Sequence, residues 1–150
     1  MDLCDRNDIQ ALLARHGFHF AKALGQNFLI RGDVAEDIAA AGCVPGCGVL
    51  EVGPGIGALT VQLARRAEKG VSVELDKRLP PVLAETMADY DNFTLIEGDV
   101  MALDLAAVTA ESSVLQQDVR EEWDGSMLLL QDTAFRSRVP QRLPSRFSTF

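Results

Sequence analysis

A glycine-rich segment is the part of this chain best suited to chemistry. It reads Glu51-Val-Gly-Pro-Gly-Ile-Gly57, follows a short apolar run and precedes a segment with helical apolar spacing. A strand, a glycine-rich turn and a helix in this order form the layout of a nucleotide-binding loop. Glycine permits a positive φ and lets a ligand approach the backbone closely, because it carries no Cβ. The segment therefore predicts a ligand site where the strand ends.

The glycine spacing leaves two ligands open. Gly53-x-Gly55-x-x-Ala58 satisfies the dinucleotide fingerprint, which would indicate an NAD-dependent oxidoreductase. The same segment fits the glycine pattern of S-adenosylmethionine-dependent methyltransferases, and Glu51, Pro54 and the third glycine at a two-residue step favour that class. A strand-to-helix turn that is glycine-rich without binding a ligand is the third interpretation.

Two acids end the next apolar run, Val71-Ser-Val-Glu-Leu-Asp76. Glu74 lies about 20 residues beyond the glycine segment, where an acid accepts hydrogen bonds from ribose hydroxyls. A carboxylate suits this task because it offers two acceptor oxygens to two neighbouring hydroxyls. Asp76 is better explained as the cap of a helix that starts near Lys77. Glu74 is therefore the candidate ribose ligand.

A further acid, Asp99, follows the strand-like run Phe93-Thr-Leu-Ile-Glu97. An acid at the carboxyl end of a third parallel strand lies beside the same crevice, where it could accept a hydrogen bond from an adenine amino group. Taken alone, Gly98-Asp99 is an ordinary turn. The repetition of polar residues at three strand ends favours the ligand interpretation.

These motifs resemble the ribosomal RNA adenine dimethylase family, and more narrowly its bacterial 16S rRNA dimethyladenosine transferase branch. The matching segments, in family order and spacing, are Phe20-Ala-Lys-Ala-Leu-Gly-Gln-Asn-Phe-Leu29, the glycine segment continued to Thr60, Val73–Asp76 and Glu97–Val100. The Gly-Gln-Asn-Phe-Leu signature is highly specific. The resemblance covers roughly residues 7 to 105.

The resemblance implies an α/β fold with a doubly wound, mostly parallel Rossmann-like sheet and S-adenosyl-L-methionine as cofactor. Glu74 would hold the ribose hydroxyls, Asp99 the adenine amine, and Gly53 the methionine part through its backbone. The full set of implied cofactor-binding residues is Asn27, Leu29, Gly53, Gly55, Glu74 and Asp99. The implied reaction is dimethylation of N6 of adjacent adenosines in small-subunit ribosomal RNA, after the target base leaves its stack.

The sequence departs from this family in its catalytic motif. Family members carry Asn-Leu/Ile-Pro-Tyr/Phe at the end of the fourth strand, where its polar groups hold the target amine and its ring stacks on the base. No such tetrapeptide occurs in the chain, so we assign no catalytic residue. The aromatic residues after position 105 stand in other contexts: Trp123, Phe135, Phe147 and Phe150. A non-catalytic cofactor-binding or ribosome-binding module is therefore the alternative.

Alternating strands and helices predict a parallel sheet with right-handed crossovers. The expected strands are 48–52, 70–75 and 93–97; the expected helices are 8–15, one capped by Asp33, 57–67 and 77–89. Met127–Leu130 is a candidate fourth strand. We therefore expect a sheet truncated after three to four strands.

The chain divides at about Leu105. Residues 1–105 carry the N-terminal part of the methyltransferase domain, and residues 106–150 form a divergent tail that we expect to be partly disordered. Residues 133–150 contain four arginines and no acid, so an RNA-contacting tail is the alternative. One hypothesis is that a frameshift or a mispredicted gene end replaced the family sequence; a catalytic tetrapeptide in another reading frame would support it.

The composition of the chain indicates which binding partners and which cell compartment to expect. The formal charge of −8 argues against strong nonspecific RNA binding. Three cysteines and no signal peptide indicate a reducing cytosol, and Cys43-x-x-x-Cys47 lacks the further ligands of a zinc site. No apolar run is long enough to span a membrane. We expect a cytoplasmic monomer with no metal and no membrane contact, whose partner is ribosomal RNA; His16 and His19 receive no catalytic role.

Overall fold

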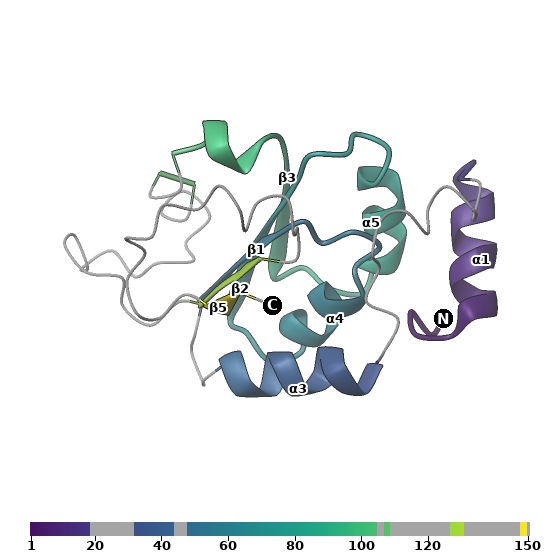
Figure 1. Ribbon diagram of the computed structural model, residues 1–150, viewed down its shortest axis with the longest axis horizontal. Helices are drawn as coiled ribbons and strands as arrows, with labels where there is room; N and C mark the ends of the chain where they lie inside the picture. Colours follow the sequence, from purple (N-terminus) through teal and green to yellow (C-terminus); the bar gives the residue numbers. More distant parts are fainter. Residues whose placement is uncertain (19–31, 44–47, 105–106, 109–126, 131–147, 150) are drawn as a thin grey trace.

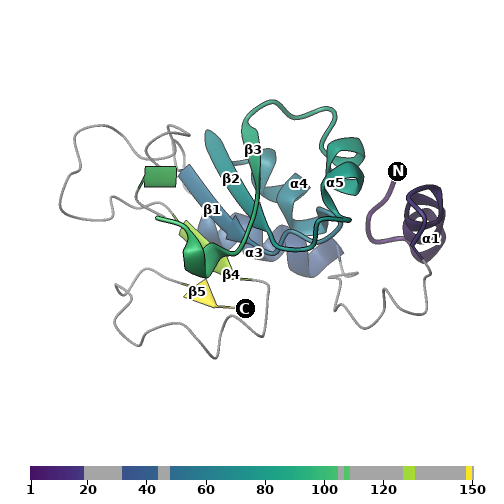
Figure 2. The same cartoon turned by 90° about the horizontal axis from the view of Figure 1, so that it is seen from above.

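A parallel sheet organises the chain, as the computed structural model shows (Figure 1). The structure describes residues 1–18, 32–43, 48–104, 107–108, 127–130 and 148–149. The strands are β1 (Gly48–Val52), β2 (Lys69–Glu74), β3 (Phe93–Glu97), β4 (Met127–Leu130) and β5 (Ser148–Thr149). They pair in the order β3-β2-β1-β4-β5, and every pairing is parallel. Figure 2 shows the strands side by side, with β5 at one edge.

The sequence predicts most of this sheet. β1 and β3 coincide with the expected strands, β2 is shifted by one residue, and β4 confirms the candidate fourth strand. The sheet extends to a fifth strand, β5, which the expected truncation leaves out. Its two residues, Ser148 and Thr149, form no apolar run, so only their pairing with β4 reveals them. All five residues of β1 are buried, as expected for a strand paired on both sides and covered on both faces.

Three helices lie on one face of the sheet: α3 (Gly32–Gly42), α4 (Ala58–Ala64) and α5 (Pro80–Thr86). A first apolar cluster joins α3 and α4 to the sheet, with Phe93 of β3 packed against it; its buried members are Ala35, Ala39, Val49, Leu59, Leu63 and Ala67. α5 begins with two prolines in its first turn, where the missing N–H groups cost little.

The expected N-cap of α3 is wrong, and its core face differs in part from what the apolar spacing predicts. Asp33 lies inside the first turn of the helix, not at its N-cap. The apolar spacing of the segment puts Val34, Ile38 and Ala41 on one face, but the buried positions are Ala35 and Ala39; Ile38 packs against their cluster and Ala41 is exposed. The contact with α4 decides this face, because small alanines let two helices approach closely, and the apolar spacing of α3 alone does not record that neighbour.

The opposite face of the sheet has its own cluster. Leu50 and Val52 of β1 meet Val71 and Val73 of β2 there. The chain that follows β3 covers them: Val100, in the 3-10 helix η1 (Val100–Ala102), is buried in this cluster, and Leu103 and Val108 pack against it. The alternation of side chains along β1 and β2 thus supplies both layers of the core.

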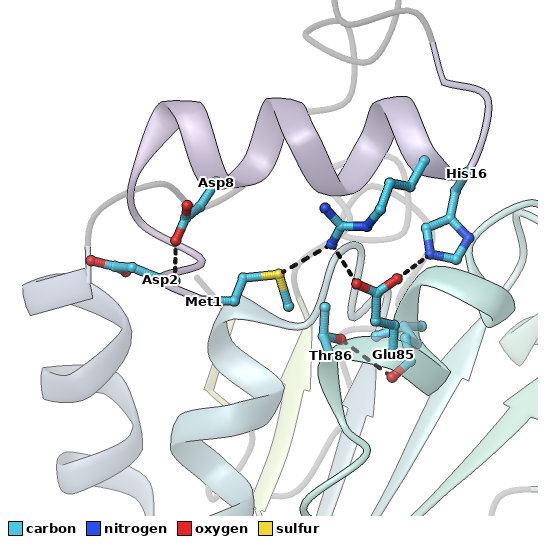
Figure 3. Close-up of polar contacts among 8 residues, drawn as sticks. Met1, Asp2, Asp8, His16, Glu85 and Thr86 are labelled. Atoms are coloured by element: carbon cyan, nitrogen blue, oxygen red, sulfur yellow. Dashed lines mark hydrogen bonds and ion pairs between the residues drawn. The ribbon is translucent and has the colours of Figure 1, made fainter.

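The N-terminal helix α1 (Arg6–Arg15) is docked on α5 by an apolar and a polar contact. Leu12 and Leu13 are fully buried in a cluster with Leu83 of α5. At the end of α1, the Glu85 carboxylate of α5 accepts a hydrogen bond from the Arg15 guanidinium and pairs with His16 Nε2, at 2.7 Å from Oε2 (Figure 3). The pairing links the end of α1 to α5.

Gly70 of β2 provides a test of the sheet packing. A Cβ added to Gly70 would lie 2.0 Å from Cζ of Phe93, the residue opposite it in β3. We expect Gly70→Ala to lower the free energy of unfolding in urea by about 1–3 kcal/mol, because the ring must leave its place over the strand. Gly98→Ala is the matched control, since its Cβ would meet nothing within 4 Å, and it should change stability by less than about 0.5 kcal/mol. If the two variants are equally stable, the packing of the Phe93 ring against β2 does not require a glycine at position 70.

Candidate functional site

The carboxyl ends of β1, β2 and β3 meet at one edge of the sheet. Parallel register places Val52 beside Val73 and Glu74 beside Glu97. Backbone hydrogen bonds continue beyond the strands, since the Gly53 N–H donates to the Val73 carbonyl at 2.9 Å and the Gly98 N–H donates to the Glu74 carbonyl at 2.8 Å. Three segments that are far apart in sequence are thereby held in one place, as the motif spacing predicts.

The glycine segment adopts a backbone that favours glycine. Gly53, Gly55 and Gly57 have φ angles of 73°, 62° and 92°, all in the left-handed region. The third glycine also has a packing role, because a Cβ on Gly57 would lie 2.8 Å from Thr86 Oγ1 of α5. Gly53 and Gly55 therefore shape the half-buried turn, whereas Gly57 lets α4 approach α5.

Glu74 is the centre of the site. Its residue is 6% exposed, and its two carboxylate oxygens accept the Gly55 N–H at 3.2 Å and the Asp76 N–H at 2.8 Å. Burial raises the pKa of the Glu74 carboxyl above its usual range, while the backbone hydrogen bonds from Asp76 and Gly55 oppose the shift. The carboxylate is held in one orientation against the glycine turn, which suits an acceptor for ligand hydroxyls.

A second buried acid lies before the first glycine. Glu51 of β1 is fully buried, and its Oε2 accepts a hydrogen bond of 2.7 Å from Ser72 Oγ of β2. This bond links the two strands directly before the glycine turn, so Glu51 supports the turn from within the sheet. Glu51, the acid that favours the methyltransferase glycine pattern, is therefore hydrogen-bonded within the sheet to Ser72.

The remaining candidate acids cap local structure. Asp99 is exposed at the start of η1, and its side chain accepts the Met101 N–H at 2.9 Å. Asp76 accepts the Arg78 N–H at 3.0 Å in the turn before α5, but the expectation that it caps this helix is wrong, because α5 begins at Pro80 and its N-cap is Leu79. Asp99 thus lies at the expected strand end in a position open to solvent.

Two apolar residues at this edge were not predicted as part of the site. Leu75 is 62% exposed and directly follows Glu74; Met101 is 47% exposed and lies two residues beyond Asp99. An exposed apolar side chain at the mouth of a ligand site can contact the ligand. The sequence signal is a large apolar residue one or two positions after each candidate acid. Asn27 and Leu29, the other predicted residues, lie outside the described residues.

The described part of the chain contains neither a metal-binding cluster nor a membrane-spanning helix. Among these residues, no group of three or more His, Cys, Asp or Glu side chains is arranged to hold a metal ion. No helix in the same residues is both long and apolar enough to cross a membrane.

Comparison with known proteins identifies relatives of this chain. The family model described as ribosomal RNA adenine dimethylase matches residues 17–133, a range that extends beyond Leu105 and includes β4. Ribosomal RNA small subunit methyltransferase A of Geobacillus thermodenitrificans is 51% identical over 111 residues, which cover 73% of this chain and 38% of that protein. The protein of the same name from Bacillus cytotoxicus is 46% identical over 121 residues, covering 79% and 41%.

Solved structures show the same fold. The 23S rRNA methyltransferase ErmE superposes with a TM-score of 0.52 at 27% identity, covering 69% of this chain and 36% of that one. A dimethyladenosine transferase from Plasmodium falciparum has a TM-score of 0.50 at 20% identity, covering 75% and 38%, and supports the fold alone. The predicted doubly wound, Rossmann-like methyltransferase fold is thereby confirmed.

The family match decides between the interpretations that the glycine spacing left open, because an NAD-dependent oxidoreductase would not share it. The chain spans about two-fifths of the length of the curated relatives that it matches. By its strand-end motifs, its fold and the match over residues 17–133, the chain belongs to the ribosomal RNA adenine dimethylase family.

Proposed function

We propose that this chain binds S-adenosyl-L-methionine at the carboxyl edge of β1, β2 and β3. The observation that carries the proposal is the Glu74 carboxylate, which is buried and held by the Gly55 amide at the point where the strands end. A ribose with two adjacent hydroxyls matches an acceptor pair in this position. When bound, the cofactor would supply an electrophilic methyl group; the residues of this edge would bind and orient it.

The surrounding residues extend this proposal to the whole cofactor. Gly53 and Gly55 would let the methionine part approach the backbone, because neither carries a Cβ. Asp99 would accept a hydrogen bond from the adenine amine at the solvent-facing end of β3. Leu75 and Met101 would cover the adenine ring, whose faces need apolar contacts that water does not provide. Asn27 and Leu29 are the remaining proposed cofactor-binding residues, and they are included because of the family resemblance.

The substrate of the family defines the proposed partner. Relatives of this chain are named ribosomal RNA small subunit methyltransferase A, so we propose small-subunit ribosomal RNA as partner and N6 dimethylation of adjacent adenosines as the family reaction. We place the cofactor-binding part in residues 1–105 of a cytoplasmic monomer. Residues 106–150 contain no Asn-Leu/Ile-Pro-Tyr/Phe motif. In this proposal the chain therefore supplies the part of the site that binds the cofactor and not the part that holds the target adenine of the RNA.

Replacement of Glu74 tests the cofactor site. We expect the wild-type chain to bind S-adenosylhomocysteine and not NAD in titration calorimetry. Glu74→Gln should weaken binding about tenfold or more, because a hydrogen bond to a charged group contributes about 1.5–3 kcal/mol. Glu68→Gln removes an exposed acid next to the opposite end of β2 and should leave affinity unchanged. Binding of NAD without S-adenosylhomocysteine would contradict the proposal.

The buried carboxylate also predicts opposite pH effects on stability and on binding. The folded-state pKa of Glu74 is raised, so protonation favours the folded state. Its stabilising contribution is fully present below the unfolded pKa of about 4.3 and is lost as pH rises through the folded pKa. We expect the unfolding free energy of wild type, relative to Glu74→Gln, to increase as pH falls from 7 towards 4.5.

Over the same interval, binding should change in the other direction. The affinity of wild type for S-adenosylhomocysteine, again relative to Glu74→Gln, should fall, because the ribose hydroxyls lose their charged acceptor. Urea denaturation and calorimetry at matched pH values measure the two effects. A relative stability that decreases on acidification would mean that the Glu74 carboxylate is stabilised, and not disfavoured, by its site.

Activity provides a separate test. The family reaction requires a group that positions the adenine amine and a ring that stacks on the base; stacking alone contributes about 1–3 kcal/mol per base. Positioning can supply about 7–11 kcal/mol of a barrier. We therefore expect the 150-residue polypeptide to transfer tritiated methyl groups to unmethylated small-subunit particles at close to the background rate, even where it binds the cofactor. A rate comparable to that of an intact family member would show that residues 106–150 contain a catalytic element of another type.

A further inference from the structure

Arg78 joins the end of α1 to the turn that follows β2. Its guanidinium lies over the Phe18 ring, 5.2 Å from the ring centroid. Nε and Nη2 of the same group contact the two carboxylate oxygens of Asp76, at 2.9 Å and 2.5 Å. Phe18 itself packs against the apolar cluster that holds α1 on α5. A residue just after α1 is thereby connected to a residue just after β2.

The pair between Arg78 and Asp76 is better defined than an ordinary ion pair on a surface. It is bidentate, its carboxylate side chain is only 18% exposed, and an aromatic ring lies against the guanidinium. The Arg78 N–H also donates to the Asp76 carboxylate at 3.0 Å, and the Leu79 N–H donates to the Asp76 carbonyl at 2.9 Å. A planar guanidinium can bind a carboxylate through two N–H groups and stack on a ring at the same time, which a lysine cannot do. Arg78 therefore fixes the position of Asp76.

Asp76 in turn acts on Glu74, the proposed ribose acceptor. The Asp76 N–H donates to one Glu74 oxygen at 2.8 Å, so the position of Asp76 sets the orientation of that carboxylate. The charge of Asp76 has an unfavourable effect: burial is the main cause of the raised pKa of Glu74, and the neighbouring Asp76 carboxylate adds to it. Glu97, beside Glu74 in β3, is an acid too. The Arg78 guanidinium thus brings positive charge to a place where the register and the turn bring negative charge.

We propose that Arg78 is a positioning residue for the cofactor, through which the Phe18 end of α1 is coupled to the Glu74 carboxylate. Arg78 holds the Asp76 amide against Glu74 and offsets the charge of the Asp76 carboxylate. It acts through Asp76 and needs no contact with the cofactor. This inference rests on the proposed cofactor site, and it adds that the N-terminal helix contributes to cofactor affinity from outside the strand-end edge.

Calorimetry with S-adenosylhomocysteine gives the first test. Arg78→Met keeps the length of the side chain and removes its charge and its N–H groups, so affinity should fall about twofold to fivefold, the size expected for loss of an exposed cation–π contact or ion pair. In a Glu74→Gln chain the same substitution should have a smaller effect, because the charged acceptor on which Arg78 acts is absent. Lys77→Met is the matched control: it removes the neighbouring exposed positive charge and should weaken binding less than Arg78→Met does.

The pKa of Glu74, measured without cofactor, gives a second test that a purely structural role would not affect. It is obtained by NMR titration of a chain with ¹³C in its glutamate carboxyl groups, in which Glu74 is the resonance that Glu74→Gln lacks. Arg78→Met should raise this pKa, because the charge of Asp76 is then less offset. Lys77→Met should raise it less.

Phe18 tests the connection to α1. Phe18→Leu keeps an apolar side chain in the cluster but removes the ring beside Arg78, so it should weaken S-adenosylhomocysteine binding, as Arg78→Met does. The double variant should bind no more weakly than Arg78→Met alone, since the two residues act along one path. Urea denaturation establishes that each variant is folded under the conditions of the titration.

The proposal is overturned if Arg78→Met leaves the pKa of Glu74 unchanged, or if it weakens binding equally in the wild-type and Glu74→Gln chains. Additive losses from Phe18→Leu and Arg78→Met would also overturn it. If the wild-type chain does not bind S-adenosylhomocysteine, the proposed function fails, and the pKa of Glu74 in Arg78→Met still decides whether Arg78 acts on that carboxylate. If Phe18→Leu does not fold, Arg78→Met decides the outcome.

Discussion

The parallel register of β1, β2 and β3 is the constraint on which the site depends. It brings the ends of all three strands to one edge and allows the Gly53 and Gly98 amides to bond across to β2. The left-handed backbone at Gly53 and Gly55 then turns an amide towards the Glu74 carboxylate. Without the register, the same residues would be dispersed along the chain and would share no ligand.

Glu74 combines two opposing demands. Burial disfavours its charged form, as the raised pKa records, yet a charged acceptor is what ribose hydroxyls require. The backbone amides of Gly55 and Asp76 offset part of this cost and fix the carboxylate in place. A buried acid with a raised pKa at a strand end is the feature on which the proposed cofactor site rests.

The scaffold around the site is built from separate contacts. The Glu51–Ser72 bond joins two strands before the glycine turn, and Gly57 sets the approach of α4 to α5. Glu85 holds the end of α1 against α5 through Arg15 and His16 (Figure 3). None of these groups needs to touch a ligand. They fix the elements from which the strand-end residues project.

Local sequence determined the strands, the glycine turn, the role of Glu74 as the acid at the end of β2, and the family, because these depend on short apolar runs and on residues at fixed spacing. Tertiary structure decided the rest. It placed Glu51 within hydrogen-bonding distance of Ser72 and brought α5 close to Gly57. It also buried Ala35 and Ala39 of α3. It also left Leu75 and Met101 exposed beside the acids and paired Ser148–Thr149 with β4. Each of these outcomes depends on a neighbour distant in sequence, and the spacing of residues along one segment contains no information about which distant segment will lie against it.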